Sequence, residues 1–195
     1  MLSEDVGGPF ERVAIDLIGP LPKTDGNHAY LLVCQDYFTK WVEATPIPNK
    51  SVKIVADAFV KSWVCRFGSP RLLHQDNGGE FTAKVFQQVC ALLGIQRTTM
   101  TPYYPQSNGM VERVNQTLQN LLKCICAETG KNWSEVVPHA LSAYRASKHN
   151  STGLSPNKLV LGKEANAPID LEFGREPTVP GCPEAYLQWL TNTIA

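Results

Sequence analysis

The chain has 195 residues, 43% of them hydrophobic, and its 18 Lys and Arg balance its 18 Asp and Glu. That length and composition suffice for one globular domain with a buried core. No uncharged apolar run reaches the roughly 18 residues of a transmembrane helix. Glu4 and Asp5 stand where a signal peptide would be basic and then apolar, so we expect an intracellular protein.

The charges are unevenly distributed along the chain. Residues 37–163 hold 15 basic residues (Lys or Arg) and 7 acidic residues (Asp or Glu). Residues 1–36 hold 2 basic and 6 acidic residues, and residues 164–195 hold 1 basic and 5 acidic residues. A basic middle between acidic ends is compatible with phosphate binding, and equally with an ordinary solvated surface.

The six cysteines and four histidines are scattered, and the sequence contains no CxxC pair. We therefore expect neither a structural zinc site nor a disulfide scaffold.

Three strands are predicted early in the chain, followed by a helix and a short strand. The turn between the second and third strands is so short that these two should pair antiparallel. The helix is predicted to begin after an N-cap serine and to end at a Gly-Ser-Pro sequence. The predicted strands are 10–18, 30–38, 41–47 and 71–74, and the helix is 51–67.

The second half of the chain is predicted to be mainly helical. Thr82 is the expected cap of a helix that is followed by a fifth strand and a Pro/Gly-marked loop. Ser155-Pro156 is expected to open a short helix ended by a glycine. The remaining elements are a helix over 82–93, a strand over 95–100, a loop over 101–109, a helix of about four turns from Val111, a helix over 133–147 and a terminal helix over 185–193.

This element order predicts an α/β domain with a mixed sheet flanked by helices. We expect the domain to occupy residues 1–165, and residues 166–195 to form a Pro/Gly-rich extension.

Several acidic residues lie where strands end or helices begin, which is where ligand sites gather in α/β folds. Asp16 ends an apolar strand, Asp76 opens a turn after the fourth strand, and Glu112 lies at the start of the long helix. Together they could bind a hard divalent cation, which prefers oxygen ligands. Each alone is equally an ordinary turn or helix-start residue. Asp36 and Glu80 are equally good candidates, and composition does not choose among the five.

The long helix carries a polar face that continues from Glu112. Its members share one side of the helix and are rich in amides: Asn115, Gln116, Gln119 and Lys123. This face extends about 10 Å beyond Glu112 to position 119 at about 1.5 Å per residue and could follow a nucleic-acid backbone. The alternative is the solvent-facing stripe of an amphipathic helix.

Two stretches resemble the catalytic core of retroviral and gypsy-class LTR-retrotransposon integrases. They are LLHQDNGGEF and LLGIQRTTMTPYYPQSNGMVERVNQTL, in which 35 residues separate Asp76 from Glu112 as in the D,D-35-E signature of that family. Upstream, FERVAIDLIGPLP is similar to the family's first strand and identifies Asp16 as the first acid. The similarity spans residues 8–165 and removes Asp36 from the catalytic set.

The resemblance implies an RNase H-like fold with a five-stranded mixed sheet. It implies that Asp16, Asp76 and Glu112 are catalytic and hold two Mg²⁺ (or Mn²⁺) ions for DNA 3′-end cleavage and strand transfer. Tyr103 and Asn108 would lie in a loop near the scissile DNA, followed by the polar helix face. The implied partners are element ends and target DNA, and the implied form is a homodimer or higher integrase assembly in the nucleus.

The sequence also departs from its family. Gln116 and Gln119 occupy helix positions that often carry Lys or Arg in relatives, which should weaken phosphate contacts. The family's N-terminal zinc-binding and C-terminal domains have no counterpart in these residues. An alternative function is therefore a domesticated or decayed integrase-derived module that binds DNA or dimerises without catalysis. An RNase H or exonuclease fits less well, because the PYYPQSNG loop has no counterpart in those enzymes.

Overall fold

The computed structural model describes residues 7–76, 78–99 and 105–166, with the side chains of 99 and 105–108 outside that description. Its centre is a five-stranded sheet in the order β3-β2-β1-β4-β5. The strands are β1 (Arg12–Ile18), β2 (Tyr30–Asp36), β3 (Val42–Ile47), β4 (Leu72–Gln75) and β5 (Gln96–Thr99).

The sheet is mixed, as the element order predicts. β1 pairs antiparallel with β2, and β2 pairs antiparallel with β3, which confirms the expected hairpin. β4 runs parallel to both β1 and β5. The carboxyl ends of β1, β4 and β5 consequently lie along one edge of the sheet, the place where an α/β fold positions its ligand site.

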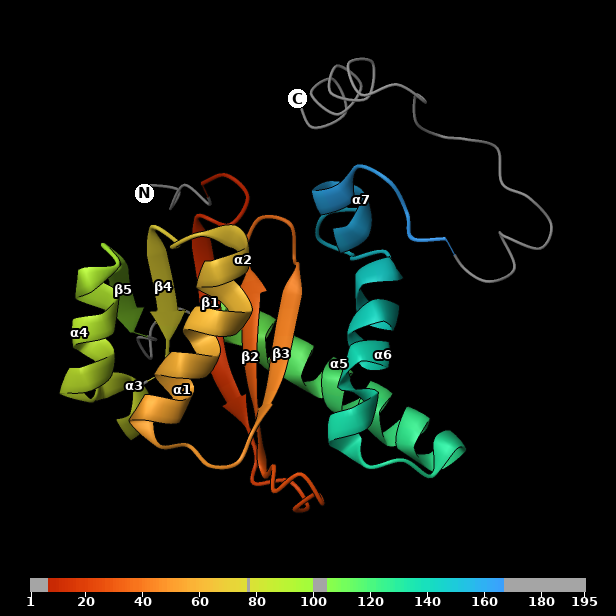
Figure 1. Ribbon diagram of the computed structural model, residues 1–195. Helices are drawn as coiled ribbons and strands as arrows, with labels where there is room; N and C mark the ends of the chain where they lie inside the picture. The colour runs from red at the N-terminus through yellow and green to blue at the C-terminus, as the bar shows by residue number, and fades with distance from the viewer. Residues whose placement is uncertain (1–6, 77, 100–104, 167–195) are drawn as a thin grey trace. The chain divides into compact units, whose positions relative to one another are not determined.

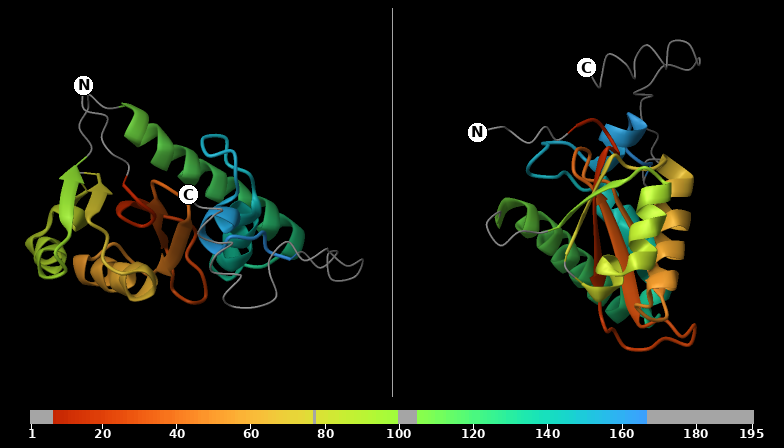
Figure 2. Two further views of the ribbon diagram at one scale, coloured as in Figure 1. Left: turned by 90° about the horizontal axis from the view of Figure 1, so that it is seen from above. Right: turned by 90° about the vertical axis from the view of Figure 1, so that its left-hand side faces the viewer.

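Helices cover both faces of the sheet (Figures 1 and 2). α1 and α4 lie on one face, and the long helix α5 crosses the other, where α6 packs against it. The helical elements are α1 (Val52–Phe59), the π-helical turn η1 (Val60–Val64), α2 (Cys65–Phe67), α3 (Gly79–Thr82), α4 (Lys84–Leu92), α5 (Pro105–Thr129), α6 (Trp133–Ala146) and α7 (Pro156–Leu161). None of the described helices has the length and apolarity needed to cross a membrane.

The two helices on the first face differ in detail from the sequence expectation. The helix predicted over 51–67 contains the π-helical turn η1 and ends at Gly68 with a φ of 86°. The helix predicted from Thr82 is broken at Ala83, which has an extended backbone. Thr82 does not cap α4, because its hydroxyl donates back to the carbonyl of Gly78 in the preceding turn.

The start of α5 corrects the predicted loop. α5 begins at Pro105, so residues 105–109 are helical rather than part of a loop, and Glu112 lies about two turns inside the helix. Proline suits the first helical position, where its missing N–H costs nothing. Gly109 inside the helix costs only about 1 kcal/mol relative to alanine. Glu112, predicted near the start of the helix, therefore lies in a regular, hydrogen-bonded part of α5.

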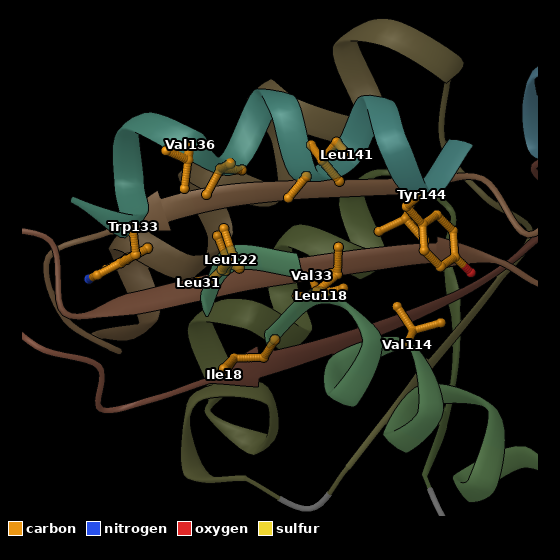
Figure 3. Close-up of a cluster of buried hydrophobic side chains, with 13 residues drawn as sticks. Ile18, Leu31, Val33, Val114, Leu118, Leu122, Trp133, Val136, Leu141 and Tyr144 are labelled. Atoms are coloured by element: carbon orange, nitrogen blue, oxygen red, sulfur yellow. The ribbon is translucent and has the colours of Figure 1, made fainter. Parts of the chain in front are cut away.

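A buried cluster fixes α5 and α6 to the sheet (Figure 3). Ile18 of β1 and Val33 of β2 contribute from the sheet, and the two helices contribute side chains at helical spacing. The helix members are Val114, Leu118, Leu122, Trp133, Val136, Val137, Ala140, Leu141 and Tyr144. Tyr144 is held further by the Gln35 side chain, whose Nε2 donates to the Tyr144 hydroxyl over 3.1 Å. The first half of α5 is therefore positioned over β1.

The chain divides into two compact units, residues 1–144 and 145–195. In the second unit, Ser155 caps α7 by accepting from the Lys158 amide over 3.0 Å, with Pro156 at the first turn, as predicted. The Ser155 hydroxyl also donates to the Glu164 carboxylate over 2.6 Å. The helix predicted over 185–193 lies outside the described residues, as does the extension from residue 167.

Candidate active site

Asp16 lies on β1 and faces α5. Side chains alternate between the two faces of a strand, and the neighbours of Asp16 on its face, Ala14 and Ile18, both belong to clusters that contain α5 residues. Its Oδ1 accepts a hydrogen bond from the Leu17 amide over 2.8 Å. Its Oδ2 accepts one from Asn115 Nδ2 over 2.6 Å. The carboxylate is therefore held in one orientation by both the strand and the helix.

Asp76 follows β4, the parallel neighbour of β1. Ile15 pairs with Gln75 in the sheet register, so Asp16 and Asp76 occupy the next position along adjacent strands. Asp76 Oδ1 accepts the Gly78 amide over 2.9 Å, which forms the expected Asx-type turn. The buried Gln75 faces away from this site, and its Nε2 donates to the Phe81 carbonyl over 3.3 Å.

Glu80 is the third carboxylate in this neighbourhood. A Cβ added at Gly78 would lie 2.9 Å from Asp76 Oδ1 and 3.0 Å from Glu80 Oε1, so both acids approach the same glycine. A larger residue at position 78 would therefore displace one or both carboxylates. Glu80 also has a cation nearby, because Lys50 Nζ lies 3.9 Å from its Oε2.

The electrostatic environment of Asp16 reflects this gathering of acids. Burial raises the pKa of Asp16, and Asp76 and Glu80 raise it further, against hydrogen bonds from Leu17 and Asn115 that lower it. The two carboxylates therefore repel each other, and no described Lys or Arg pairs with either of them.

Asp36 has a different role, as the resemblance implies. Its side chain is fully buried, and its Oδ2 accepts hydrogen bonds from the Thr39 amide over 2.7 Å and the Thr39 hydroxyl over 2.6 Å. Its Oδ1 accepts the Phe10 amide over 3.1 Å. These donors hold the turn between β2 and β3, so Asp36 stabilises the fold.

The polar face of α5 meets the site through Asn115. Asn115 binds Asp16, so this face is not simply the solvent-facing stripe of an amphipathic helix. Glu112 lies one turn before Asn115 on the same side and is exposed. Gln116 is exposed and donates from Nε2 to the Asn120 side chain over 3.0 Å. Gln119 and Lys123 line a cavity farther along the helix.

Two predicted DNA contacts are not placed by the structure. Tyr103 lies outside the described residues, and for Asn108 only the backbone is described, inside α5.

The residues fit a divalent cation in part. Asp16 and Asp76 supply oxygen ligands, pair with no Lys or Arg in the described ranges, and occupy the next position after Ile15 and Gln75 on adjacent strands. Within the described ranges, however, no group of three or more His, Cys, Asp or Glu is close enough to hold a metal ion. Glu112 therefore does not join the two aspartates in one cluster in this conformation.

The same span of chain matches a known family. The model of the integrase core domain covers residues 8–105, a span that includes both Asp16 and Asp76 and ends before Glu112. The chain belongs to the integrase core domain family.

Relatives of this integrase core occur within much longer polyproteins. The core is 38% identical to the Gag-Pol polyprotein of Avian reticuloendotheliosis virus over 154 residues, which cover 79% of this chain and 12% of that protein. It is 30% identical over 159 residues to the retrovirus-related Pol polyprotein from transposon 412 of Drosophila melanogaster, covering 82% of this chain and 13% of that protein. The chain thus spans about an eighth of the length of these relatives.

Solved integrase structures share its fold. The catalytic core domain of BIV integrase superposes with a TM-score of 0.65 at 27% identity and covers 78% of this chain and 95% of that one. The HTLV-2 integrase catalytic core, solved in complex with magnesium in a trimeric form, gives 0.63 at 22% identity and covers 76% and 94%. The fold is therefore that of an RNase H-like integrase core, as the resemblance implies.

Proposed function

We propose that this integrase core catalyses divalent-metal-dependent DNA 3′-end cleavage followed by strand transfer. The observation that carries the proposal is the uncompensated carboxylate pair, Asp16 and Asp76, at neighbouring strand ends. A fold that places two repelling acids side by side loses stability unless a cation or a proton joins them.

Each residue has a distinct part in the proposed site. Asp16 and Asp76 would hold Mg²⁺ or Mn²⁺, and Glu112 would complete the ligand set from α5. When bound, two such ions would activate the attacking oxygen and stabilise the leaving oxygen. Asn115 orients Asp16 through its 2.6 Å hydrogen bond and lowers the pKa of that carboxyl, which favours metal binding over protonation.

The proposed chemistry consists of two in-line displacements at phosphorus. In the first, water forms the new P–O bond and the bond from phosphorus to the 3′ oxygen of the retained DNA strand breaks, so that the 3′ oxygen leaves as a hydroxyl. In the second, that 3′-hydroxyl attacks a phosphodiester of target DNA, and the target's own 3′ oxygen leaves. No covalent intermediate with the protein is required, so positioning and charge neutralisation supply the catalysis.

A branched DNA that mimics the joined product tests this proposal. We expect the full chain with Mn²⁺ or Mg²⁺ to cleave and rejoin a labelled branch, and Asp76→Asn and Glu112→Gln to abolish the product. Asp57→Asn is the matched control, because Asp57 is exposed on α1, where it forms an ion pair with Lys61 at 2.8 Å.

Three results would contradict the proposal. If Asp76→Asn gave as much product as the parent chain, or if product formed in EDTA, the carboxylates and their metal would not be needed for the reaction. DNA binding that is equal with and without metal, with no cleavage, would favour the non-catalytic module. Cleavage confined to an RNA–DNA hybrid would favour an RNase H.

DNA ends and target DNA are the proposed partners. The proposed active form is a dimer or higher assembly, because joining two DNA ends to one target in a single event requires more than one active site. Light scattering of the chain with and without DNA measures that assembly.

A further inference from the structure

A cavity of about 390 Å³ opens between the loop after β1, the second half of α5 and the start of α6. Its apolar floor includes Leu21, Leu122 and Trp133. Leu122 and Trp133 belong to the buried cluster that joins α5 and α6 to the sheet (Figure 3). Trp133 Nε1 also donates to the Pro22 carbonyl over 2.7 Å and so ties the loop to α6. The cavity is therefore preformed, and its volume lies within the roughly 300–1,000 Å³ of small-molecule sites.

Three lysines from three different elements surround this apolar floor. Lys23 comes from the loop, Lys123 from α5 and Lys131 from the turn before α6, and all three are exposed. None of them forms an ion pair with a carboxylate in the part of the chain that the structure describes. A lysine can extend its aliphatic stem over apolar surface and keep its ammonium group in water. The cavity consequently suits a ligand with a flat apolar body and flanking anionic groups.

The cavity and the carboxylates lie along the same face of α5. Asn115 contacts Asp16, Gln119 lines the cavity one turn later, and Lys123 stands at its rim. The four residues from Asn115 to Gln119 span about 6 Å of helix. That length equals about two nucleotides at roughly 3.4 Å of axial rise each. A DNA strand held at the carboxylates and running along α5 would reach the cavity after about two nucleotides.

We propose that this cavity receives an unpaired base of a DNA strand, about two nucleotides from the phosphodiester at Asp16 and Asp76, while the lysines contact the flanking phosphates. The inference rests on the proposed function for the position of the strand. The base must be unpaired, because a paired base could not leave its partner to enter a cavity lined by a loop and two helices. Unpairing costs a few kcal/mol in a duplex and least at a frayed or single-stranded end. The site therefore favours DNA ends over intact duplex.

A fluorescence scan of the full chain without divalent metal tests the base. The probes are DNA duplexes with a six-nucleotide single-stranded 3′ segment that carries 2-aminopurine at each position in turn. We expect the emission change to peak at one position of the single-stranded segment, and an abasic nucleotide at that position to weaken binding about tenfold. Cys126→Phe, which places a ring in the cavity, should abolish the peak while a duplex without overhang still binds.

Single lysine substitutions test the phosphate contacts, and they keep the proposal falsifiable if Cys126→Phe fails to fold. Lys123→Gln and Lys131→Gln should each lower the slope of log affinity against log salt by about 0.7, the value for one contact with a single strand. Lys53→Gln is the matched control, because Lys53 is exposed on α1 at the opposite face of the sheet.

A flat 2-aminopurine scan, or equal slopes for Lys123→Gln and Lys53→Gln, would overturn the proposal. A third result would also overturn it: the chain binds an acidic, leucine-containing peptide, and Lys123→Gln loses that binding but binds the DNA probes as before. The cavity would then serve a protein partner. All these measurements are made without metal, so they do not depend on cleavage. If the chain binds the base but never cleaves DNA, the proposed function is refuted and the proposal for the cavity stands.

Discussion

Replacing Asp76 with asparagine should stabilise the metal-free protein while removing its response to metal. Asparagine has the same shape and can still accept the Gly78 amide through Oδ1, so the turn is retained. What disappears is the repulsion between the carboxylates of Asp16 and Asp76. Adjacent strands lie about 4.8 Å apart. Two charges about 5 Å apart in a well-screened environment repel each other by about 1 kcal/mol.

The pH dependence gives this prediction a definite sign. The pKa of Asp16 is raised in the folded protein, first by burial and then by Asp76 and Glu80. The folded state thus holds that proton more tightly than the unfolded chain does, and the resulting stabilisation is lost as pH rises through the folded pKa. Metal-free repulsion is therefore greatest at neutral pH and fades as pH falls through the raised pKa of Asp16.

Calorimetry in EDTA and in Mg²⁺ measures both effects. At pH 7 in EDTA, Asp76→Asn should raise Tm by about 2–4 °C, the shift that about 1 kcal/mol produces in a protein of this size. Mg²⁺ at ten times its Kd should stabilise the parent chain by about 1.4 kcal/mol and the variant by much less. Asp57→Asn should change neither value. A lower Tm for Asp76→Asn in EDTA, or a full Mg²⁺ response, would refute the reasoning.

Three further substitutions probe other contacts. Asn115→Ala removes a hydrogen bond that lowers the pKa of Asp16. In a plot of cleavage rate against pH, the acidic limb should therefore move to higher pH. Gln116→Ala is the control and should leave that limb in place. Asp36→Ala should lower the free energy of urea unfolding by about 3 kcal/mol, because it leaves buried donors without an acceptor. The stabilisation by Mg²⁺ should not change. A loss below about 1 kcal/mol would contradict the role of Asp36 in the turn. Pro138→Ala, inside α6, should stabilise the chain by about 1 kcal/mol or more by restoring a helix hydrogen bond, and a lower thermal midpoint would argue against that reason.

Local signals in the sequence predict most of the elements. The Gly-Ser-Pro after α2 and Ser155-Pro156 before α7 act within a few residues, so their effects can be read without tertiary contacts. The short turn between β2 and β3 likewise predicts their pairing. Pro105 shows how such a signal can be misread, because a proline that opens a helix resembles one that marks a loop.

The candidate site depends on contacts that no local signal encodes. Asn115 and Asp16 are 99 positions apart in the chain, and only the fold brings them together. The five acids look alike in sequence, and they separate in the structure by what surrounds them. Asp36 accepts several hydrogen bonds and Glu80 has Lys50 nearby, whereas Asp16 and Asp76 lie on adjacent strands and pair with no Lys or Arg among the described residues. The cavity lysines come from three separate segments and share no motif.

The two edges of the sheet restrict how copies of this chain can associate. β3 and β5 are the outermost strands, and each has a feature that discourages a neighbouring strand from joining the hydrogen-bond ladder. Pro46 removes an amide donor from β3. β5 is a short, polar Gln-Arg-Thr-Thr segment, and Arg97 turns inward to bond the Phe81 carbonyl over 3.2 Å. Such edges resist runaway polymerisation through continuous sheets. We therefore expect copies of this chain to associate through helices or loops rather than through a continuous sheet.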